Sequence, residues 1–148
     1  MFGIQWDLTL RYLQATGVAT QTELTSNSES WGNYRLEYSL NQEKTVHGYK
    51  GTLSTSDWKT VTWDAITNEY SHPNSYDALS TGATERNVKK NIYDLAGNIY
   101  EWTLEHATFY SNFPCAVRGG YFSSTGSDSP ASYRVDYYTA SSYYGVRF

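Results

Sequence analysis

The residue types that most often carry catalysis or hold metal ions are sparse in this chain. Its single cysteine, Cys115, excludes an internal disulfide and a cysteine-based zinc cluster. The three histidines, His47, His72 and His106, lie far apart and lack the short spacings typical of metal ligands. No Gly-x-Ser-x-Gly elbow or ordered Ser/His/Asp set occurs in the sequence. We therefore expect a protein that is not an enzyme, with Cys115 as a small buried apolar residue and the histidines in surface or structural roles.

The end of the chain has an unusual composition. Residues 121–148 hold six Tyr and seven Ser, but no Lys, Glu, Gln, Met or Trp. Those five types occur 23 times in the first 120 residues, so about five would be expected in a tail of ordinary composition. A codon of the form NNC, reached by replacing the adenines of AAC, encodes none of the five and never a stop. The pattern indicates adenine-targeted diversification of this segment.

Tyrosine combined with serine and glycine is also the composition of antibody binding loops. Tyrosine supplies large, rigid contact area, and the small residues supply adaptable hydrogen bonds. The aromatic pairs Tyr137-Tyr138 and Tyr143-Tyr144 are hard to explain as ordinary solvated surface. The sequence therefore predicts a binding surface at 121–144. The alternatives are a loop and edge strand that are rich in Tyr and Ser for packing alone, and simple compositional drift.

The bulk properties exclude several other classes of partner. A chain of 148 residues fits one domain with a core of its own. Only 18% of the residues are charged, the net charge is −4 and no basic run occurs, which argues against nucleic acid. No apolar stretch approaches the ~18 residues of a membrane span, so direct membrane insertion is not expected. Residues 1–6 show no signal peptide.

One helix is clear in the sequence, over residues 4–16. Trp6, Leu10 and Leu13 fall on one face of it, Ile4 and Leu8 flank that face, and Gly17 ends the helix. Residues 20–60 and 71–87 are predicted to be loops, with one short helix in the first of them. Residues 60–66 fit a short helix or a strand equally well.

The strands are predicted in the second half of the chain. Residues 91–103 predict strand, turn and strand, with the turn at 94–98 and the second strand at 99–103. A further strand is predicted at 117–122 with a kink at its two glycines, and a last one at 144–148. Few helices, short strands and long loops predict an α+β domain. Because the chain stops within a strand, we expect residues 1–148 to be a single domain that forms the C-terminal part of a longer protein.

Three blocks of this sequence resemble the formylglycine-generating enzyme (sulfatase-modifying factor) family. Residues 91–102, Asn-Ile-Tyr-Asp-Leu-Ala-Gly-Asn-Ile-Tyr-Glu-Trp, are similar to its N-x-Y-D-M-x-G-N-V-W-E-W block. Residues 117–122 are similar to its L-R-G-G-S-W block, and residues 145–148 to its closing G-F-R strand. The resemblance implies a C-type-lectin-like fold of that subtype, with a small twisted antiparallel sheet, two helices and much irregular loop. In that setting Trp102 is expected in the core, and Arg118 and Arg147 are expected to pair with carbonyls or carboxylates.

The catalytic residues of that family are missing. The family's enzymes hold copper with two cysteines that lie a few residues before an arginine, between the R-G-G and G-F-R blocks. The matching segment here, 129–134, contains no cysteine, and Cys115 lies before the R-G-G block. Copper–thiolate chemistry therefore has no ligands. The iron-dependent relatives need a histidine-rich site, which the isolated histidines do not provide.

The tail is similar to a subfamily, the variable proteins of diversity-generating retroelements. These often carry the formylglycine-enzyme type of C-type-lectin fold and end in a diversified repeat. The resemblance implies that positions 126–127, 130–132 and 134 are framework, and that residues between them line the ligand site. The expected ligand contacts are Tyr121, Phe122, Ser123, Ser124, Thr125, Asp128, Tyr133, Val135, Asp136, Tyr137, Tyr138, Ser141, Ser142, Tyr143 and Tyr144.

The resemblance also raises the question of a structural calcium ion. The positions that match the family's calcium site are Asp94, Gly97, Ile99 and Glu101, which offer carboxylate and carbonyl oxygens. The alternative is that Asp94 and Glu101 pair with Arg118, with Arg147 or with backbone amides. No cofactor is required for the expected function.

Together these observations predict a receptor- or adhesin-type binding domain with a hypervariable surface. The resemblance implies a protein or glycan ligand on a host or neighbouring cell, and display from a phage tail tip or a bacterial surface; it fixes no oligomeric state. One rival is a formylglycine-generating-type oxidoreductase or a degenerate, non-catalytic relative of it. Another is a structural tail or capsid module that buries its tyrosine-rich face between subunits.

Overall fold

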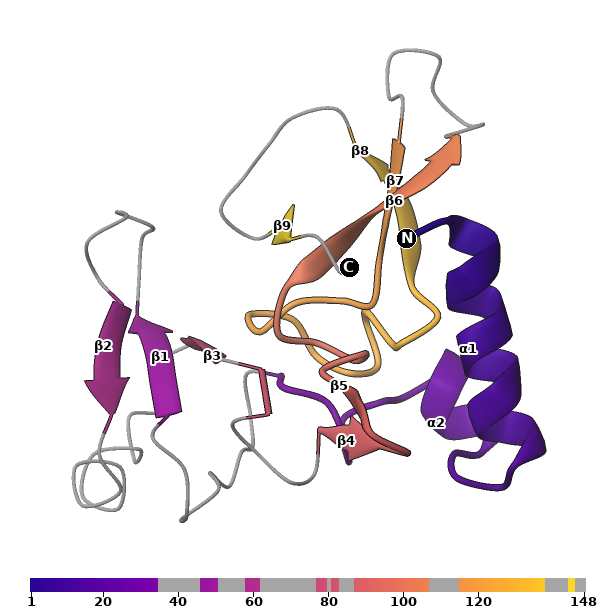
Figure 1. The fold of residues 1–148 in the computed structure, drawn as a ribbon, viewed down its shortest axis with the longest axis horizontal. Helices are drawn as coiled ribbons and strands as arrows, with labels where there is room; N and C mark the ends of the chain where they lie inside the picture. Colours follow the sequence, from indigo (N-terminus) through magenta and orange to yellow (C-terminus); the bar gives the residue numbers. More distant parts are fainter. Residues whose placement is uncertain are drawn as a thin grey trace.

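The fold is described from a computed structural model, over residues 1–34, 46–50, 58–61, 77–79, 81–82, 87–106, 115–137 and 144–145 (Figure 1). Within these ranges the chain forms two helices and nine short strands, which confirms the predicted α+β class. The elements are α1 (Gly3–Ala15), α2 (Gln21–Thr25), β1 (Val46–Lys50), β2 (Trp58–Val61), β3 (Asp77–Leu79), β4 (Val88–Lys89), β5 (Ile92–Tyr93), β6 (Tyr100–His106), β7 (Cys115–Arg118), β8 (Arg134–Tyr137) and β9 (Tyr144–Gly145).

The main sheet has four strands in the order β8-β7-β6-β9. Its pairs β8–β7 and β7–β6 are antiparallel, and β9 pairs with β6 in parallel. A second sheet has the order β2-β1-β3, and β4 and β5 form a separate two-stranded pair. Figure 1 shows α1 and α2 together on one side of the molecule, with the sheet of β1, β2 and β3 on the opposite side.

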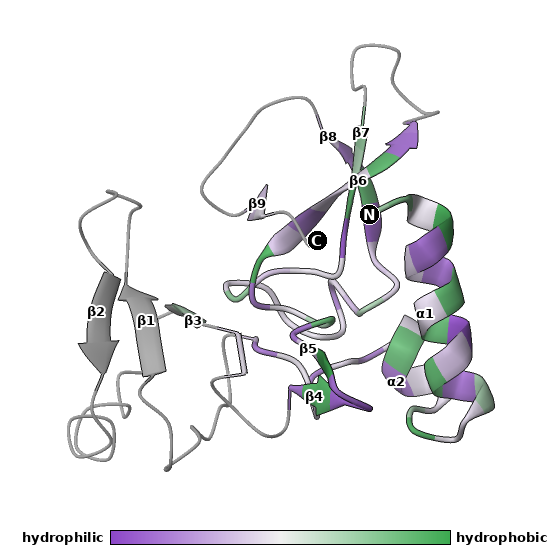
Figure 2. Ribbon diagram, in the orientation of Figure 1, coloured by the Kyte–Doolittle hydropathy of each residue, from purple (hydrophilic) through white to green (hydrophobic). Residues whose placement is uncertain are grey.

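The predicted first helix is confirmed, with a difference in its faces. Helix α1 covers Gly3–Ala15, and Trp6, Leu10 and Leu13 are buried as expected. The placement of Ile4 and Leu8 beside that face is wrong, because their side chains are 66% and 60% exposed. At 100° per residue they lie with Tyr12 along a separate stripe of the helix. Figure 2 shows hydrophobic residues recurring along α1 between hydrophilic ones.

The predicted short helix is α2, and its sequence explains where it begins. The Thr20 hydroxyl accepts a hydrogen bond from the Glu23 backbone N–H at 3.2 Å. The Glu23 carboxylate accepts one in return from the Thr20 N–H at 2.7 Å. This reciprocal capping satisfies two donors that a helix start leaves open. Neither helix in the described part of the chain is long and apolar enough to cross a membrane.

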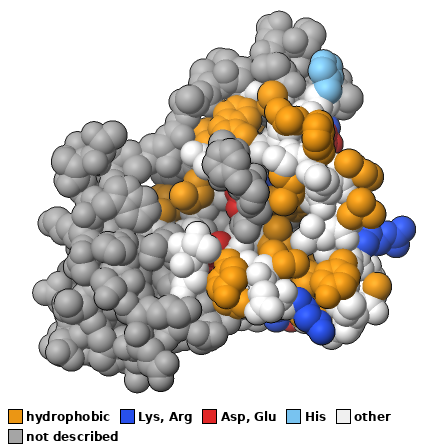
Figure 3. Space-filling view, viewed as in Figure 1, with side chains coloured by type: hydrophobic (Ala, Val, Ile, Leu, Met, Phe, Trp, Pro, Cys, Tyr) orange, Lys and Arg blue, Asp and Glu red, His pale blue; other side chains and the backbone are white. Residues whose placement is uncertain are grey.

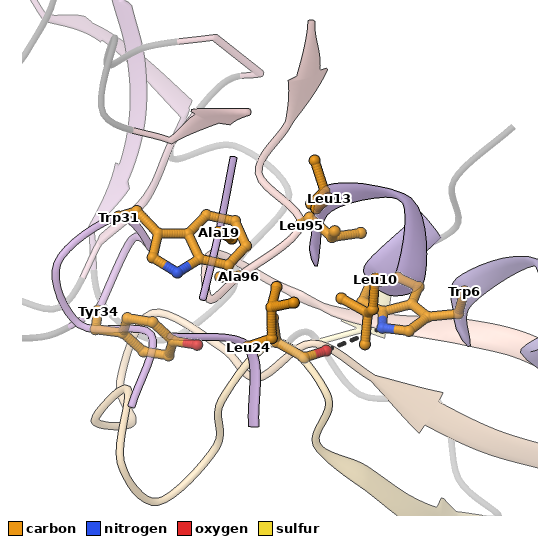
Figure 4. Packing of buried hydrophobic residues seen from close by; sticks show 10 residues of the cluster. Trp6, Leu10, Leu13, Ala19, Leu24, Trp31, Tyr34, Leu95 and Ala96 are labelled. Atoms are coloured by element: carbon orange, nitrogen blue, oxygen red, sulfur yellow. Dashed lines mark hydrogen bonds between the residues drawn. The ribbon is translucent and has the colours of Figure 1, made fainter. Parts of the chain in front are cut away.

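The core lies between the helices and the loops that surround the main sheet. It gathers buried residues from five separate segments: Trp6, Leu10, Leu13, Ala19, Leu24, Trp31, Tyr34, Leu95, Ala96 and Ala131 (Figure 4). The polar groups of two core aromatic side chains make hydrogen bonds to the backbone of the tail. The Trp6 indole N–H donates to the Ala131 carbonyl at 2.9 Å, and the Tyr34 hydroxyl donates to the Ser129 carbonyl at 2.7 Å. Burial of large aromatic rings with satisfied polar ends supplies much of the stability.

Five of the described strands were not predicted from the sequence, among them the two-residue β4, which lies just before the first predicted strand. Strands β1, β2 and β3 lie in segments that were expected to be loops or were left ambiguous. Their sequences, such as Val-His-Gly-Tyr-Lys, interrupt the alternation of apolar and polar residues that marks a strand. Strand β8 does alternate, as Arg-Val-Asp-Tyr, but lies within the Tyr/Ser-rich tail and was taken for loop.

The turn at 94–98 and the two glycines at 119–120 shape the centre of the molecule. The turn follows β5 and precedes β6, as expected, although these two strands pair with other partners. The predicted strand at 117–122 is shorter: β7 ends at Arg118, because Gly119 and Gly120 have φ of +87° and +78°. Such values favour glycine and redirect the backbone into the following loop.

Candidate ligand-binding face

The register of the main sheet assigns its residues to two faces. Across β7 and β8, Arg118 lies opposite Arg134, and Val117 lies opposite Val135. Across β6 and β7, Trp102 lies opposite Val117. Because cross-strand partners share a face and neighbours along a strand alternate, the charged residues and the apolar residues separate. One face is therefore charged, and the other carries the aromatic residues.

The charged face is joined to helix α1 by ion pairs. Arg118, which is almost completely buried, pairs with the carboxylates of Asp7 and Glu105 and donates to the Ser132 carbonyl at 3.2 Å. This confirms the expectation that Arg118 would pair with carbonyls or carboxylates. Arg134 reaches the same Glu105 carboxylate at 2.5 Å. The Glu105 carboxylate, shared by two arginines, links β6, β7 and β8, and the pair of Arg118 with Asp7 joins these strands to α1.

Asp136 belongs to this charged face. Its side chain is buried, and one carboxylate oxygen lies 3.9 Å from the Arg134 guanidinium. Phe122, another expected ligand contact, is also buried, where it packs with Ala78 of β3 and with Ile99. A side chain that is buried in the protein has little surface to offer a ligand. We therefore leave these two residues out of the candidate face.

The aromatic face centres on the ring of Tyr100, at the start of β6. The ring centroids of Tyr121, Tyr133 and Tyr144 lie 4.7, 5.8 and 5.6 Å from it, all in stacked orientations. Tyr144 also contacts Trp102 at 5.3 Å and Tyr137 at 4.8 Å. We call these six residues, Tyr100, Trp102, Tyr121, Tyr133, Tyr137 and Tyr144, the tyrosine cluster.

Most members of the tyrosine cluster are only partly covered. Tyr100 is 9% exposed, whereas Trp102 and the four tyrosines of the tail have intermediate exposure. Figure 3 shows hydrophobic side chains reaching the surface in the region between β8 and β9. The expectation that Trp102 would be a core residue is therefore wrong, because its ring is only partly buried and belongs to the tyrosine cluster. Among the residues that the structure describes, the core tryptophans are Trp6 and Trp31.

The loop that carries Tyr121 and Tyr133 is held in place by its other residues. Gly126, Ser129, Pro130 and Ala131 are buried, and the Gly126 N–H donates to the Glu29 carboxylate at 2.6 Å. The Ser124 hydroxyl donates to that of Ser129 at 3.0 Å. The framework expected at 126–127 and 130–132 is thus largely buried, although Ser127 is exposed. Fixed backbone with partly exposed side chains between its anchors is the geometry that a variable face needs.

The expected contact residues thus fall into three groups. Tyr121, Ser123, Ser124, Thr125, Asp128, Tyr133, Val135, Tyr137 and Tyr144 are partly or fully exposed. Phe122 and Asp136 are buried. Tyr138, Ser141, Ser142 and Tyr143 lie outside the described residues, as does Arg147. Sequence reasoning missed Tyr100 as part of the site, although the alternation of Tyr100, Glu101 and Trp102 would have placed both rings on one face.

Two tyrosines of the cluster, Tyr100 and Tyr144, have pKa values raised above the ordinary value and stay uncharged over the ordinary pH range. Burial raises the pKa of Tyr100. Burial, and after it a hydrogen bond with the Tyr137 side chain, raises the pKa of Tyr144. The Tyr34 hydroxyl in the core has a raised pKa for the same first reason, desolvation. The aromatic face therefore offers neutral hydroxyls and ring surface, which suits contacts through stacking and hydrogen bonds.

These raised pKa values predict a loss of stability at alkaline pH. Above about pH 10 the unfolded chain releases tyrosine protons that the folded chain retains. The contribution of these tyrosines to the free energy of unfolding is therefore fully present below that pH and is lost as the pH rises above it. For Tyr34, which is 1% exposed, the slope approaches about 1.4 kcal/mol per pH unit. Urea unfolding across this range measures it. Tyr34→Phe should give a shallower slope, and an unchanged slope would contradict the assignment.

The carboxylate of Asp94, the first predicted calcium ligand, is engaged in local hydrogen bonds. It is 5% exposed and accepts hydrogen bonds from the Gly82 N–H at 3.2 Å and from the Asn87 amide at 3.3 Å. Pairing with a backbone amide was the alternative that the sequence left open for this residue. Glu101 is partly buried and lies opposite Arg118 in the sheet. The calcium site stays a prediction, with Gly97 and Ile99 as its remaining members.

The residue types that could support redox or hydrolytic chemistry do not converge in the part of the chain that is described. No group of three or more His, Cys, Asp or Glu side chains there could share a metal ion. Cys115 is a free thiol and is only partly buried, so the expectation of full burial is wrong. His106 is exposed, as expected, whereas His72 and the side chain of His47 lie outside the described residues.

Comparisons with known proteins bear on the resemblance that the sequence motifs raised. No protein-family model, no curated protein and no solved structure matches this chain. The family membership, the fold subtype and the function therefore rest on the motifs and on the geometry described above.

Proposed function

We propose that this chain is a non-enzymatic, C-type-lectin-like ligand-binding domain of the kind that diversity-generating retroelements diversify. Three motif blocks in the order of the formylglycine-generating enzyme family support this proposal, together with the α+β class of the fold. The bias of residues 121–148 toward residue types that NNC codons encode supports the diversification. Neither argument depends on a catalytic residue.

The observation that carries the proposal is that buried residues of the tail hold its backbone in place, while other residues of the tail keep their side chains partly exposed. Ser129 and Ala131 are buried and accept hydrogen bonds from Tyr34 and Trp6. Tyr121, Tyr133 and Tyr144 of the same segment place partly exposed rings in the tyrosine cluster. A segment that served packing alone would gain more from burying its tyrosines fully. Fixed anchors between exposed aromatic residues are typical of binding loops.

The chemistry of the face indicates how a ligand would bind. Its side chains are mainly neutral tyrosines and serines, and the charges of Arg134 and Asp136 are used on the opposite face of the sheet. The proposed ligand is a protein or glycan on a host or neighbouring cell, bound by aromatic contact and hydrogen bonds. The proposed setting is a phage tail tip or a bacterial surface.

The test is the DNA around the gene. We expect a near-copy of the segment that encodes residues 118–148, beside a reverse transcriptase gene, with mismatches confined to adenines of the copy. The structure sharpens the expected pattern. Mismatches should fall on codons of partly or fully exposed residues such as Tyr121, Asp128 and Tyr137, and spare those of the buried Gly120 and Ala131.

Two outcomes would contradict the proposal. One is the absence of any near-copy, together with a tail that is identical in sibling strains, which would make the tyrosine cluster a fixed surface. The other is a near-copy whose mismatches fall equally on buried and exposed positions. The codons of residues 87–106, upstream of the tail, are the internal control and should not vary between strains.

A further inference from the structure

The tyrosine cluster has a centre that does not belong to the variable segment. Tyr100 comes from β6, 21 positions before Tyr121 in the sequence, and its ring is the one that Tyr121, Tyr133 and Tyr144 all stack on. These three partners come from different parts of the tail: the start of the loop, its end and strand β9. One upstream ring thus contacts three separate points of the proposed binding face.

The position of Tyr100 itself is fixed by the sheet and by the loop. Strand β6 is an inner strand between β7 and β9, and Tyr100 lies directly opposite Tyr144. Its hydroxyl lies 3.5 Å from that of Ser129, whose carbonyl in turn accepts from Tyr34. Just before it, the Asn98 carbonyl accepts a hydrogen bond from the Phe122 N–H at 2.9 Å. The ring is therefore held on the sheet side and on the loop side.

We propose that Tyr100 is the positioning residue of the binding face, an unvaried ring that orders the tyrosines of the variable segment before a ligand arrives. The inference rests on the proposed function. Stacked aromatic rings favour one orientation over others. Each exposed side chain that is ordered in advance removes part of the entropy cost of binding. A tyrosine introduced by diversification at 121, 133 or 144 would find its stacking partner already in place.

This role separates Tyr100 from the ligand contacts themselves. At 9% exposure it offers a ligand little surface, so its effect on affinity must pass through its neighbours. The flat ring is the necessary feature, because Tyr121, Tyr133 and Tyr144 stack on it. The hydroxyl contributes less, since its contact with Ser129 is long at 3.5 Å. Phenylalanine at position 100 should therefore preserve the positioning role of Tyr100, whereas residues without a ring should not.

The experiment uses displayed copies of the full chain and lysozyme as a defined probe. Residues 123–125, 128 and 137 are randomised while Tyr121, Tyr133 and Tyr144 are kept, and clones that bind immobilised lysozyme are selected. Each selected binder is remade with Tyr100→Leu, Tyr100→Met and Tyr100→Phe, and Kd is measured. We expect Leu and Met to weaken binding by about tenfold or more, and Phe by less than about threefold.

A variant that destabilises the fold elsewhere serves as the control, because it separates an effect on the positions of the tyrosines from an effect on folding. Leu13→Ala removes a fully buried side chain of α1 and leaves the tyrosine cluster untouched. In the same binders it should lower the unfolding midpoint while leaving Kd unchanged at temperatures where the chain is folded. Near-ultraviolet circular dichroism of the free proteins gives a second readout. The tyrosine signal should change with Tyr100→Leu and persist with Tyr100→Phe.

The outcomes distinguish the two ideas. If binders are found and Tyr100→Leu or Tyr100→Met keeps their affinity, the positioning role is wrong and the proposed function stands. If Tyr100→Phe weakens binding as much as Leu does, the ring is not the feature that matters and the inference also fails. If no clone binds lysozyme, both the binding function and the role of Tyr100 are contradicted.

Discussion

Replacing Trp6 with alanine is expected to lower the free energy of unfolding by about 3–5 kcal/mol. The indole is fully buried among Leu10, Leu13 and Leu24, and its N–H holds the Ala131 carbonyl at 2.9 Å (Figure 4). The substitution would leave a cavity in the core and an unsatisfied carbonyl in the tail. Because domains of this size are stable by only about 5–15 kcal/mol, such a loss approaches unfolding. Urea denaturation measures it.

The matched control lies on the same helix. Leu8 is 60% exposed, so Leu8→Ala should change the free energy of unfolding by less than about 0.5 kcal/mol. Trp6→Phe, which keeps a ring but removes the donor to Ala131, should cost about 1–3 kcal/mol. Equal losses for Trp6→Ala and Leu8→Ala would show that the core is not where the structure places it.

The second large effect is expected at Gly97, where two backbones meet. Gly97 forms an isolated parallel bridge with Asn33, and a Cβ at this position would run into the Asn33 carbonyl. The Asn33 carbonyl accepts a hydrogen bond from the Asn98 N–H at 2.8 Å, and the Gly97 N–H donates to the Gly119 carbonyl at 2.7 Å. Gly97→Ala must displace these segments, so we expect a loss of about 3 kcal/mol or more.

Gly17 offers a control that isolates the close approach. Its φ of +69° is almost the same as the +70° of Gly97, but nothing lies within 4 Å of a Cβ built there. Gly17→Ala therefore carries only the cost of left-handed backbone, about 1–2 kcal/mol. The difference between the two variants in urea unfolding measures the contact with Asn33. If both cost the same, the bridge between Asn33 and Gly97 contributes nothing to stability.

The sequence predicts the parts of this fold that depend on local patterns. Helix α1 follows from the spacing of Trp6, Leu10 and Leu13, whereas the short helix α2 is predicted only as one helix somewhere within residues 20–60. Patterns of the same kind do not reveal β1, β2 and β3, because each is defined by partners distant in the chain. The exposure of Ile4 and Leu8 likewise depends on which side of α1 the rest of the chain covers.

The candidate site shows the same division. Composition alone predicts that the site lies within residues 121–144, because the bias toward Tyr and Ser can be seen without knowing which residues meet in the folded chain. Composition cannot say that Asp136 turns toward Arg134 while Val135 and Tyr137 lie on the other face of the sheet, because that depends on strand register. Nor can it include Tyr100, which lies outside the biased segment and joins the site only through stacking in the folded chain.

The order of strands in the main sheet has a consequence for evolution. The inner strands, β7 and β6, come from residues before the tail, whereas the outer strands, β8 and β9, come from the tail. A new residue in an outer strand disturbs one ladder of hydrogen bonds instead of two, so we expect substitutions to be tolerated better in β8 and β9 than in β6 and β7. Arg134, which is exposed on β8, also places a charge at this edge of the sheet, and charged side chains at sheet edges generally oppose edge-to-edge pairing. If the tail varies as proposed, its changes fall at the edges of the main sheet and leave the inner pair of strands intact.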